Sequence, residues 1–184
     1  MMIYYSITKL YIVDKELDTL PDDISRYTEL KKLVCSYNKI TTLDNLPESL
    51  EVLCCSNNTL TALDNLPQCL KELYCDRNKI SALNNLPLAL EILDCSDNTL
   101  SSLNNLPPTL KTLYCVNNNI NTLDNLPPRL EKLSCNSNFI TSLDNLSQSL
   151  VSLQFDIDKL IHYPKNFKIT NGSWHDTYKL EYII

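Results

Sequence analysis

The chain has 184 residues, which fits one domain, and 43% of them are hydrophobic against 21% charged, a composition that excludes a disordered or fibrous protein. Acidic residues outnumber lysine and arginine by 22 to 16, and the resulting net charge of −6 disfavours nucleic acid as a partner. No apolar run is long enough to cross a membrane, so none is expected to do so.

Residues 1–29 are predicted to form an N-terminal cap and a degenerate first repeat. The opening stretch MMIYYSITKLYIVDKEL lacks a basic start and a small-residue cleavage site, and Lys9 interrupts its apolar residues. These features predict no classical signal peptide and therefore an intracellular, cytoplasmic protein, in which eight cysteines would stay reduced.

Residues 30–149 consist of six repeats of twenty residues without insertion. Each follows the pattern L-x-x-L-x-C-x-x-N-x-[IL]-x-x-L-[DN]-N-L-[PS], beginning at Leu30. Residues 150–163 match it less well, with Phe155 at the cysteine position and Asp158 at the asparagine position. Residues 164–184 leave the pattern and are predicted to cap the open core with Phe167, Trp174 and Tyr178.

The segment L-x-x-L-x-C alternates between inward and outward positions, which is typical of a short strand. Stacked repeats then give one parallel sheet of about eight strands, spaced at about 4.8 Å. The remainder of each repeat is too short for a helix and contains proline, so extended, polyproline-like or 3-10 backs are expected.

This pattern resembles the leucine-rich repeat family over most of the chain, in its shortest, twenty-residue class. That class is known from leucine-rich effectors of bacterial type III secretion and from proteins of giant DNA viruses of amoebae. The resemblance implies a single curved solenoid over residues 1–184, mostly β within the α/β repeat class, with its parallel sheet on the concave face.

Three rows of residues recur at the repeat spacing and are interpreted as structural. Amides in the asparagine row can bond backbone groups of neighbouring coils, a role that the family also implies. This row contains Asn38, Asn58, Asn78, Asn98, Asn118 and Asn138. A strictly alternating charge row should add ion pairs between coils. It contains Lys31, Glu51, Lys71, Glu91, Lys111 and Glu131. A convex Asp/Asn row beginning at Asp44 is interpreted as turn capping rather than as a cation site.

The cysteine row could be reactive, metal-binding or merely packed. A straight buried row cannot converge on zinc, and Ile12 and Phe155 occupy the same position in the end units, so packing is favoured and no metal or cofactor is predicted. The row contains Cys35, Cys55, Cys75, Cys95, Cys115 and Cys135. Cys54 and Cys69 lie off the row, and both histidines, His162 and His175, are distant from Cys54 in sequence.

Outward strand positions differ between repeats, and they form the predicted partner-binding site on the concave face. Two tyrosines flank an aspartate there, and other acidic residues lie nearby, so the site suits a partner protein segment with basic residues. The predicted site contains Tyr74, Asp94, Tyr114, Glu72, Asp76, Arg77, Asp97, Val34 and Cys54.

The predicted function is a non-catalytic protein-interaction module, and the resemblance suggests a viral or effector protein that acts on host proteins in the host cytoplasm. A structural or self-associating virion component is one alternative, and a cysteine-dependent enzyme or redox protein is another. The partner and the oligomeric state do not follow from the sequence.

Overall fold

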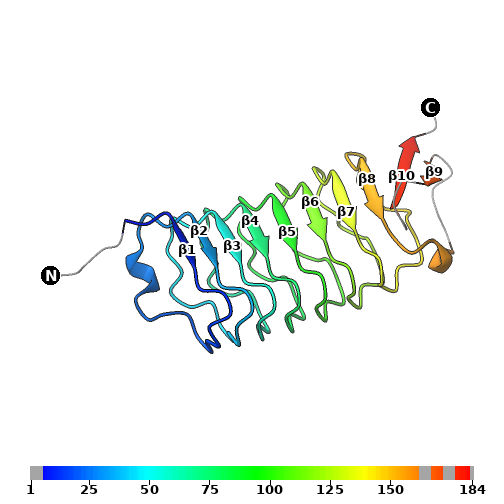
Figure 1. The fold of residues 1–184 in the computed structure, drawn as a ribbon. Coiled ribbons are helices and arrows are strands. Elements are labelled where there is room, and N and C mark those ends of the chain that lie inside the picture. The colour runs from blue at the N-terminus through cyan, green and yellow to red at the C-terminus, as the bar shows by residue number, and fades with distance from the viewer. Residues whose placement is uncertain (1–5, 162–166, 172–176, 183–184) are drawn as a thin grey trace.

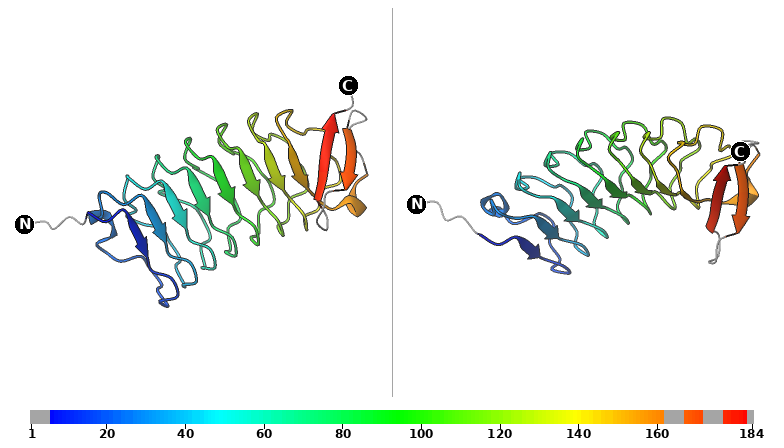
Figure 2. Two further views of the ribbon diagram at one scale, coloured as in Figure 1. Left: turned by 45° about the horizontal axis from the view of Figure 1, so that its top comes forward. Right: turned by 90° about the horizontal axis from the view of Figure 1, so that it is seen from above.

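The computed structural model describes residues 6–161, 167–171 and 177–182. The chain winds into a curved solenoid in which each repeat contributes one coil (Figure 1). Eight strands of three residues line its inner side, so the sheet lies on the concave face as expected (Figure 2). They are β1 (Lys9–Tyr11), β2 (Lys32–Val34), β3 (Val52–Cys54), β4 (Glu72–Tyr74), β5 (Ile92–Asp94), β6 (Thr112–Tyr114), β7 (Lys132–Ser134) and β8 (Ser152–Gln154).

These eight strands pair in parallel and in chain order. From β2 to β8 the register joins residues twenty apart, so that Leu33 lies opposite Leu53 and Tyr74 opposite Asp94. The first pair joins residues 23 apart, Leu10 with Leu33, because the opening unit is longer. Every sequence position of the repeat therefore becomes a row across the sheet.

The core is a stack of these rows. Leu53 is fully buried while its strand neighbours Val52 and Cys54 remain partly exposed, which confirms the predicted alternation. Full burial of a leucine or isoleucine is worth about 1.5–3 kcal/mol. Each coil buries its apolar side chains only against the coils on either side, so the stability of the fold comes from stacking.

The backs of the regular coils are irregular chain with turns. In each, the N–H of the leucine that opens the next repeat donates to a carbonyl three residues earlier, as Leu50 does to Pro47 at 3.1 Å. In the described part of the chain, 3-10 helix occurs only in the flanking units, as η1 (Ile24–Arg26) and η2 (Ile157–Lys159). The repeated backs therefore consist of irregular chain and turns, without the 3-10 helix that was one of the expectations.

Left-handed backbone without glycine explains how a chain with one glycine turns its corners. One row of positive φ lies on the convex turns, at Asn45, Asn65, Asn85, Asn105 and Asn125, with φ between 57° and 64°. A second lies just after the strands, at Tyr37, Asn57, Arg77, Asp97, Asn117 and Ser137, with φ between 52° and 59°. Asparagine tolerates this region better than most residues, and it occupies the whole first row.

The tail adds two strands that the repeat pattern did not predict. β10 (Thr177–Tyr182) pairs antiparallel with β8, placing Tyr178 opposite Leu153, and β9 (Phe167–Asn171) pairs antiparallel with β10. The sheet therefore ends in a hairpin (Figure 1). Trp174, which was expected in the cap, lies outside the described residues, and the capping role of the tail stays a prediction.

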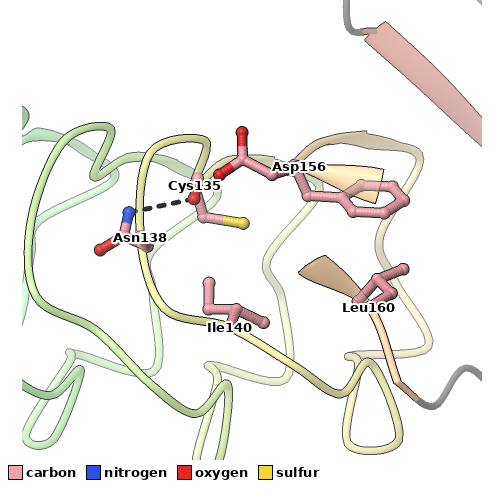
Figure 3. A pocket seen from close by; sticks show the side chains of 6 residues that line it. Cys135, Asn138, Ile140, Asp156 and Leu160 are labelled. Carbon is pink, nitrogen blue, oxygen red and sulfur yellow. Dashed lines mark hydrogen bonds between the residues drawn. The ribbon is translucent and has the colours of Figure 1, made fainter. Parts of the chain in front are cut away.

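The last coil replaces the asparagine in an unexpected way. Asp158 matches the asparagine position in sequence, but it is exposed in η2. Instead the Asp156 carboxylate accepts from the Ser137 N–H at 2.8 Å, and the Lys159 ammonium donates to the Asn138 carbonyl at 3.0 Å. Figure 3 shows this end of the core, where Ile140 and Leu160 line a small gap that Phe155 also lines. The gap between them has no room for a water molecule, so it is not a ligand site.

Candidate interaction surface

The asparagine row is structural, as its contacts show. The Asn98 amide donates to the carbonyls of Cys75, Cys95 and Ser96 at 3.0–3.1 Å and accepts from the Ile80 N–H at 2.9 Å. The other rungs from Asn58 to Asn138 make the same set of bonds, and no side-chain polar atom buried within the described residues lacks a partner. Because these amides are fully used inside the fold, they are not available to a ligand.

The cysteine row is packed in the core. All six side chains are at most 1% exposed, and the thiols of Cys75, Cys95, Cys115 and Cys135 also donate weakly to a carbonyl of the next strand, at 3.2–3.5 Å. Burial raises the pKa of the Cys35 and Cys135 thiols to about 12 and that of the other four well above the usual range. Thiolate, the reactive form, is therefore suppressed along the whole row.

Cys54 and Cys69 differ from that row. Cys69 is exposed, and Cys54 is half-buried on the concave face. Burial is the main cause that raises the pKa of Cys54; Lys32 opposes that rise, and the carboxylates of Glu72 and Asp76 add smaller contributions to it. A raised pKa is the opposite of what nucleophilic activation requires. The two histidines lie outside the described residues.

Shallow hollows of about 150 to 230 Å³ lie between neighbouring coils on the convex side. Their carboxylates are held locally: Asp124 accepts from the Thr122 hydroxyl at 2.9 Å, and Asp144 from the Ser142 hydroxyl at 2.6 Å. Asn145 bridges to Asp124 of the preceding coil at 2.5 Å. No group of three metal-binding side chains occurs in the described residues, and the contacts favour the predicted turn capping.

The concave face brings most of the predicted binding residues together. Val34, Cys54, Tyr74, Asp94 and Tyr114 form one continuous row, because each is paired in register with the next. All five are partly exposed, and Tyr114 is 37% exposed. At the far end of the row Ser134 departs from this pattern, since it is buried and donates to Gln154 at 2.6 Å. The row also extends to Tyr11 on β1, which pairs with Val34 and is 60% exposed, so its continuous accessible part spans β1 to β6.

Asp94 lies at the centre of this row, between the two tyrosines. Burial raises the pKa of its carboxyl, hydrogen bonds from Ser96 oppose that rise, and the negative charges of Asp76 and Asp97 add to it. The Ser96 N–H donates to the carboxylate at 3.1 Å. Asp94 is thus a partly desolvated anion surrounded by other anions.

Tyr74 is also tied into the acidic surface. Its hydroxyl donates to the Glu72 carboxylate at 3.1 Å, and burial together with this bond raises the pKa of Tyr74 to about 12. Asp76 accepts a hydrogen bond from the Ser56 hydroxyl of the preceding coil. Neutral donors therefore hold both carboxylates in place without neutralising them.

Arg77 and Asp97 occupy the turns after β4 and β5, beside the sheet face rather than on it. The Arg77 guanidinium lies 3.7 Å from the Asp97 carboxylate, which also accepts from the Asn117 amide at 2.6 Å. This pairing neutralises the single arginine of the predicted site. The remaining carboxylates, Glu72, Asp76 and Asp94, leave the patch negatively charged.

The alternating charge row runs along the rim before the strands, and its first five members form ion pairs while Glu131 has none among the described residues. Glu51 lies 3.0 Å from Lys31 and 2.8 Å from Lys71, and Glu91 lies 2.7 Å from Lys111. The neighbouring lysines lower the pKa of both Glu51 and Glu91. These rim lysines are therefore engaged with the rim and do not compensate the concave carboxylates.

Solved structures share this arrangement. The leucine-rich repeat domain of a Shigella effector is 39% identical, with a TM-score of 0.56, over 62% of this chain and 51% of that one. YopM from Yersinia pestis is 35% identical, with a TM-score of 0.69, over 77% of this chain and 40% of that one. The chain is a leucine-rich repeat solenoid. No family model and no curated protein matches it.

The leucine-rich repeat solenoid also resembles the functional domain of InlJ from Listeria monocytogenes, which includes a cysteine ladder. Identity there is 25% and the TM-score 0.56, over 82% of this chain and 44% of that one. The chain spans about half or less of the length of these three proteins. Leucine-rich repeat domains are in general protein-interaction modules, because stacked repeats create an extended concave surface.

Sequence reasoning missed several residues that shape this surface. Ser56 and Ser96 hold Asp76 and Asp94, and they lie two coils apart in the row that follows the central one. The repeat frame predicts that these serines lie on the face, but their hydrogen bonds depend on side-chain conformation.

Among the described residues, no helix is of the length and apolar character that crossing a membrane requires.

Proposed function

We propose that this leucine-rich repeat solenoid is a non-catalytic module that binds a partner protein through the concave face of β2–β7. The observation that supports this proposal is the contrast between the two sides of each strand. Inward positions repeat the same residue types in every regular coil and are buried, whereas outward positions differ from coil to coil and stay accessible in most coils. Packing accounts for the first set, and it leaves the second free to specify a partner.

The composition of the outward side supports binding. Tyr74 and Tyr114 offer large amphipathic side chains on rigid strands, and such residues commonly anchor protein interfaces. Hydrogen bonds already fix Tyr74 to Glu72 and Asp94 to Ser96, so little side-chain entropy is lost when a partner docks.

The same geometry disfavours the enzymatic alternative. Cys54 is the off-row thiol on this face, and its raised pKa keeps it protonated at neutral pH. Two of the similar structures are bacterial effectors, and on that ground we extend the proposal to action on host proteins; the host cytoplasm as its location stays a hypothesis. A viral origin and a structural role in a virion stay alternative hypotheses.

The test compares three forms of the full chain in protein capture from a candidate host lysate. They are wild type, the concave variant Tyr74→Ala/Asp94→Lys/Tyr114→Ala, and the convex variant Ser81→Ala/Asp64→Lys/Ser101→Ala, whose residues are exposed and which makes the same change of charge. Wild type and the convex variant should recover the same proteins, and the concave variant should lose them. Equal recovery by all three would refute concave binding, and size measurement in solution would then identify self-association.

A further inference from the structure

The charges of the concave face are segregated along the solenoid. Its carboxylates lie in the middle, where Glu72 is on β4, Asp76 directly follows β4, and Asp94 is on β5. Its lysines lie on either side, with Lys32 on β2 and Lys132 on β7. The face therefore reads positive, negative, positive along the direction in which the strands stack.

None of these charges is neutralised within the described part of the chain. The ion pairs there consume the rim lysines, Arg77, Lys39 and Lys159, and no pair includes any residue of the concave charge pattern. Glu72, Asp76 and Asp94 accept hydrogen bonds only from hydroxyl and amide groups. The cations of those ion pairs pair with other carboxylates, so Glu72, Asp76 and Asp94 keep their negative charges without a cationic partner in the described residues.

A guanidinium group matches the centre of this face better than other cations do. It is planar, carries five donors that can bridge two carboxylates, and is weakly hydrated, so it stacks readily on tyrosine. Tyr74 and Tyr114 stand on the strands at either side of Asp94 in the register. Asp76 follows β4 and Asp94 lies on the neighbouring strand β5, and the negative charge of Asp76 adds to that of Asp94, so both carboxylates favour a cation at the centre of this face.

The strand spacing gives the span of the matching ligand. Asp94 is three strands from Lys32 and two from Lys132. At about 4.8 Å per strand these separations are about 14 and 10 Å, which correspond to about four and three residues of extended chain. A ligand of about eight residues therefore reaches all three charged regions at once.

We propose that the concave face binds an extended segment of a partner protein that places an arginine over Asp94 and acidic residues against Lys32 and Lys132. This proposal rests on the proposed function and specifies the chemistry of its partner. Charge complementarity sets the position of the segment along the solenoid, since a shift of two strands toward β7 would place its arginine near Lys132 and one acidic residue near Glu72.

Two labelled peptides of eight residues test the proposal by fluorescence anisotropy against the full chain. Both carry glutamate at the first and eighth positions, and arginine stands at the fifth in one and at the fourth in the other, to allow for either chain direction. The control peptides exchange the two kinds of charge. At least one glutamate–arginine–glutamate peptide should bind tenfold or more tightly than its charge-exchanged control, and its binding should weaken as salt is raised.

Variants of the protein locate the contact. Asp94→Asn should weaken binding of the better peptide at least fivefold, whereas Asp64→Asn on the convex side makes the same chemical change and should leave it unaltered. Thermal unfolding of both variants verifies that they remain folded. Equal binding of the charge-exchanged peptide, or equal loss with Asp64→Asn, overturns the proposal.

The capture experiment separates this result from the proposed function. If the concave triple variant loses the captured proteins while Asp94→Asn leaves peptide binding unchanged, concave binding stands and the arginine proposal is wrong. If the triple variant captures the same proteins as wild type, the proposed function itself fails.

Discussion

Replacing Asn98 by alanine should destabilise the solenoid strongly, because one side chain serves two coils. The amide is 9% exposed and makes three donor contacts, to the carbonyls of Cys75, Cys95 and Ser96, and one acceptor contact, from Ile80. Alanine would leave the buried Ile80 N–H without this partner, at a cost of about 1–3 kcal/mol.

The carbonyls add to this cost. Each loses one hydrogen bond, and a net hydrogen bond is worth about 0.5–1.5 kcal/mol, although neighbouring losses are not additive. Allowing for partial relaxation, we expect Asn98→Ala to lower the free energy of unfolding by about 3 kcal/mol. That is a large share of the 5–15 kcal/mol typical of a whole domain.

Urea denaturation followed by circular dichroism measures the change. Asn119→Ala is the matched control, because Asn119 directly follows the ladder residue Asn118, is exposed, and makes no side-chain bond within the described residues. The control should change the free energy of unfolding by less than about 0.5 kcal/mol. A loss below about 1 kcal/mol for Asn98→Ala would show that the ladder is not a main source of coil-to-coil stability.

Three further predictions concern the thiols, the central carboxylate and the convex turns. A maleimide should label Cys69 quickly and Cys54 slowly in the native protein, leaving the six row cysteines unmodified until urea is added, as mass spectrometry would show; early labelling of the row would contradict its burial. The folded state raises the pKa of Asp94 and so disfavours its ionised form, and Asp94→Asn should therefore raise the free energy of unfolding at pH 7 by up to about 1 kcal/mol. This gain should fade as the pH drops through the raised pKa toward about 3.9, the usual value in an unfolded chain. Urea denaturation at several pH values measures the gain, and a gain that stays constant with pH would argue against titration as its cause. At Asn85, with φ of 57°, alanine should cost about 1 kcal/mol and glycine close to nothing in the same assay, whereas equal effects would rule out backbone strain.

Much of the fold was predictable because the repeat constrains it. A row of leucines at fixed spacing has no way to bury itself except by stacking, and the alternation around Leu53 assigns each neighbour to one side of the sheet. The same frame places Tyr74, Asp94 and Tyr114 on one face of the sheet. The ends of the solenoid were less predictable, because an end coil has a neighbouring coil of the regular repeat on one side only. Asp158 keeps the sequence register but is exposed, while Asp156 and Lys159 form hydrogen bonds to the preceding coil.

The sequence by itself determined the solenoid, the buried rows and the identity of the outward residues, because a period of twenty residues translates directly into neighbours in space. Only the tertiary structure decided which outward charges are compensated. Arg77 and Asp97 are predicted site residues of opposite charge that pair with each other, while Asp94 keeps only neutral donors. The physical reason is that ion pairing depends on side-chain directions and on differences of an ångström or two in the distance between charged atoms, which a repeat pattern does not specify.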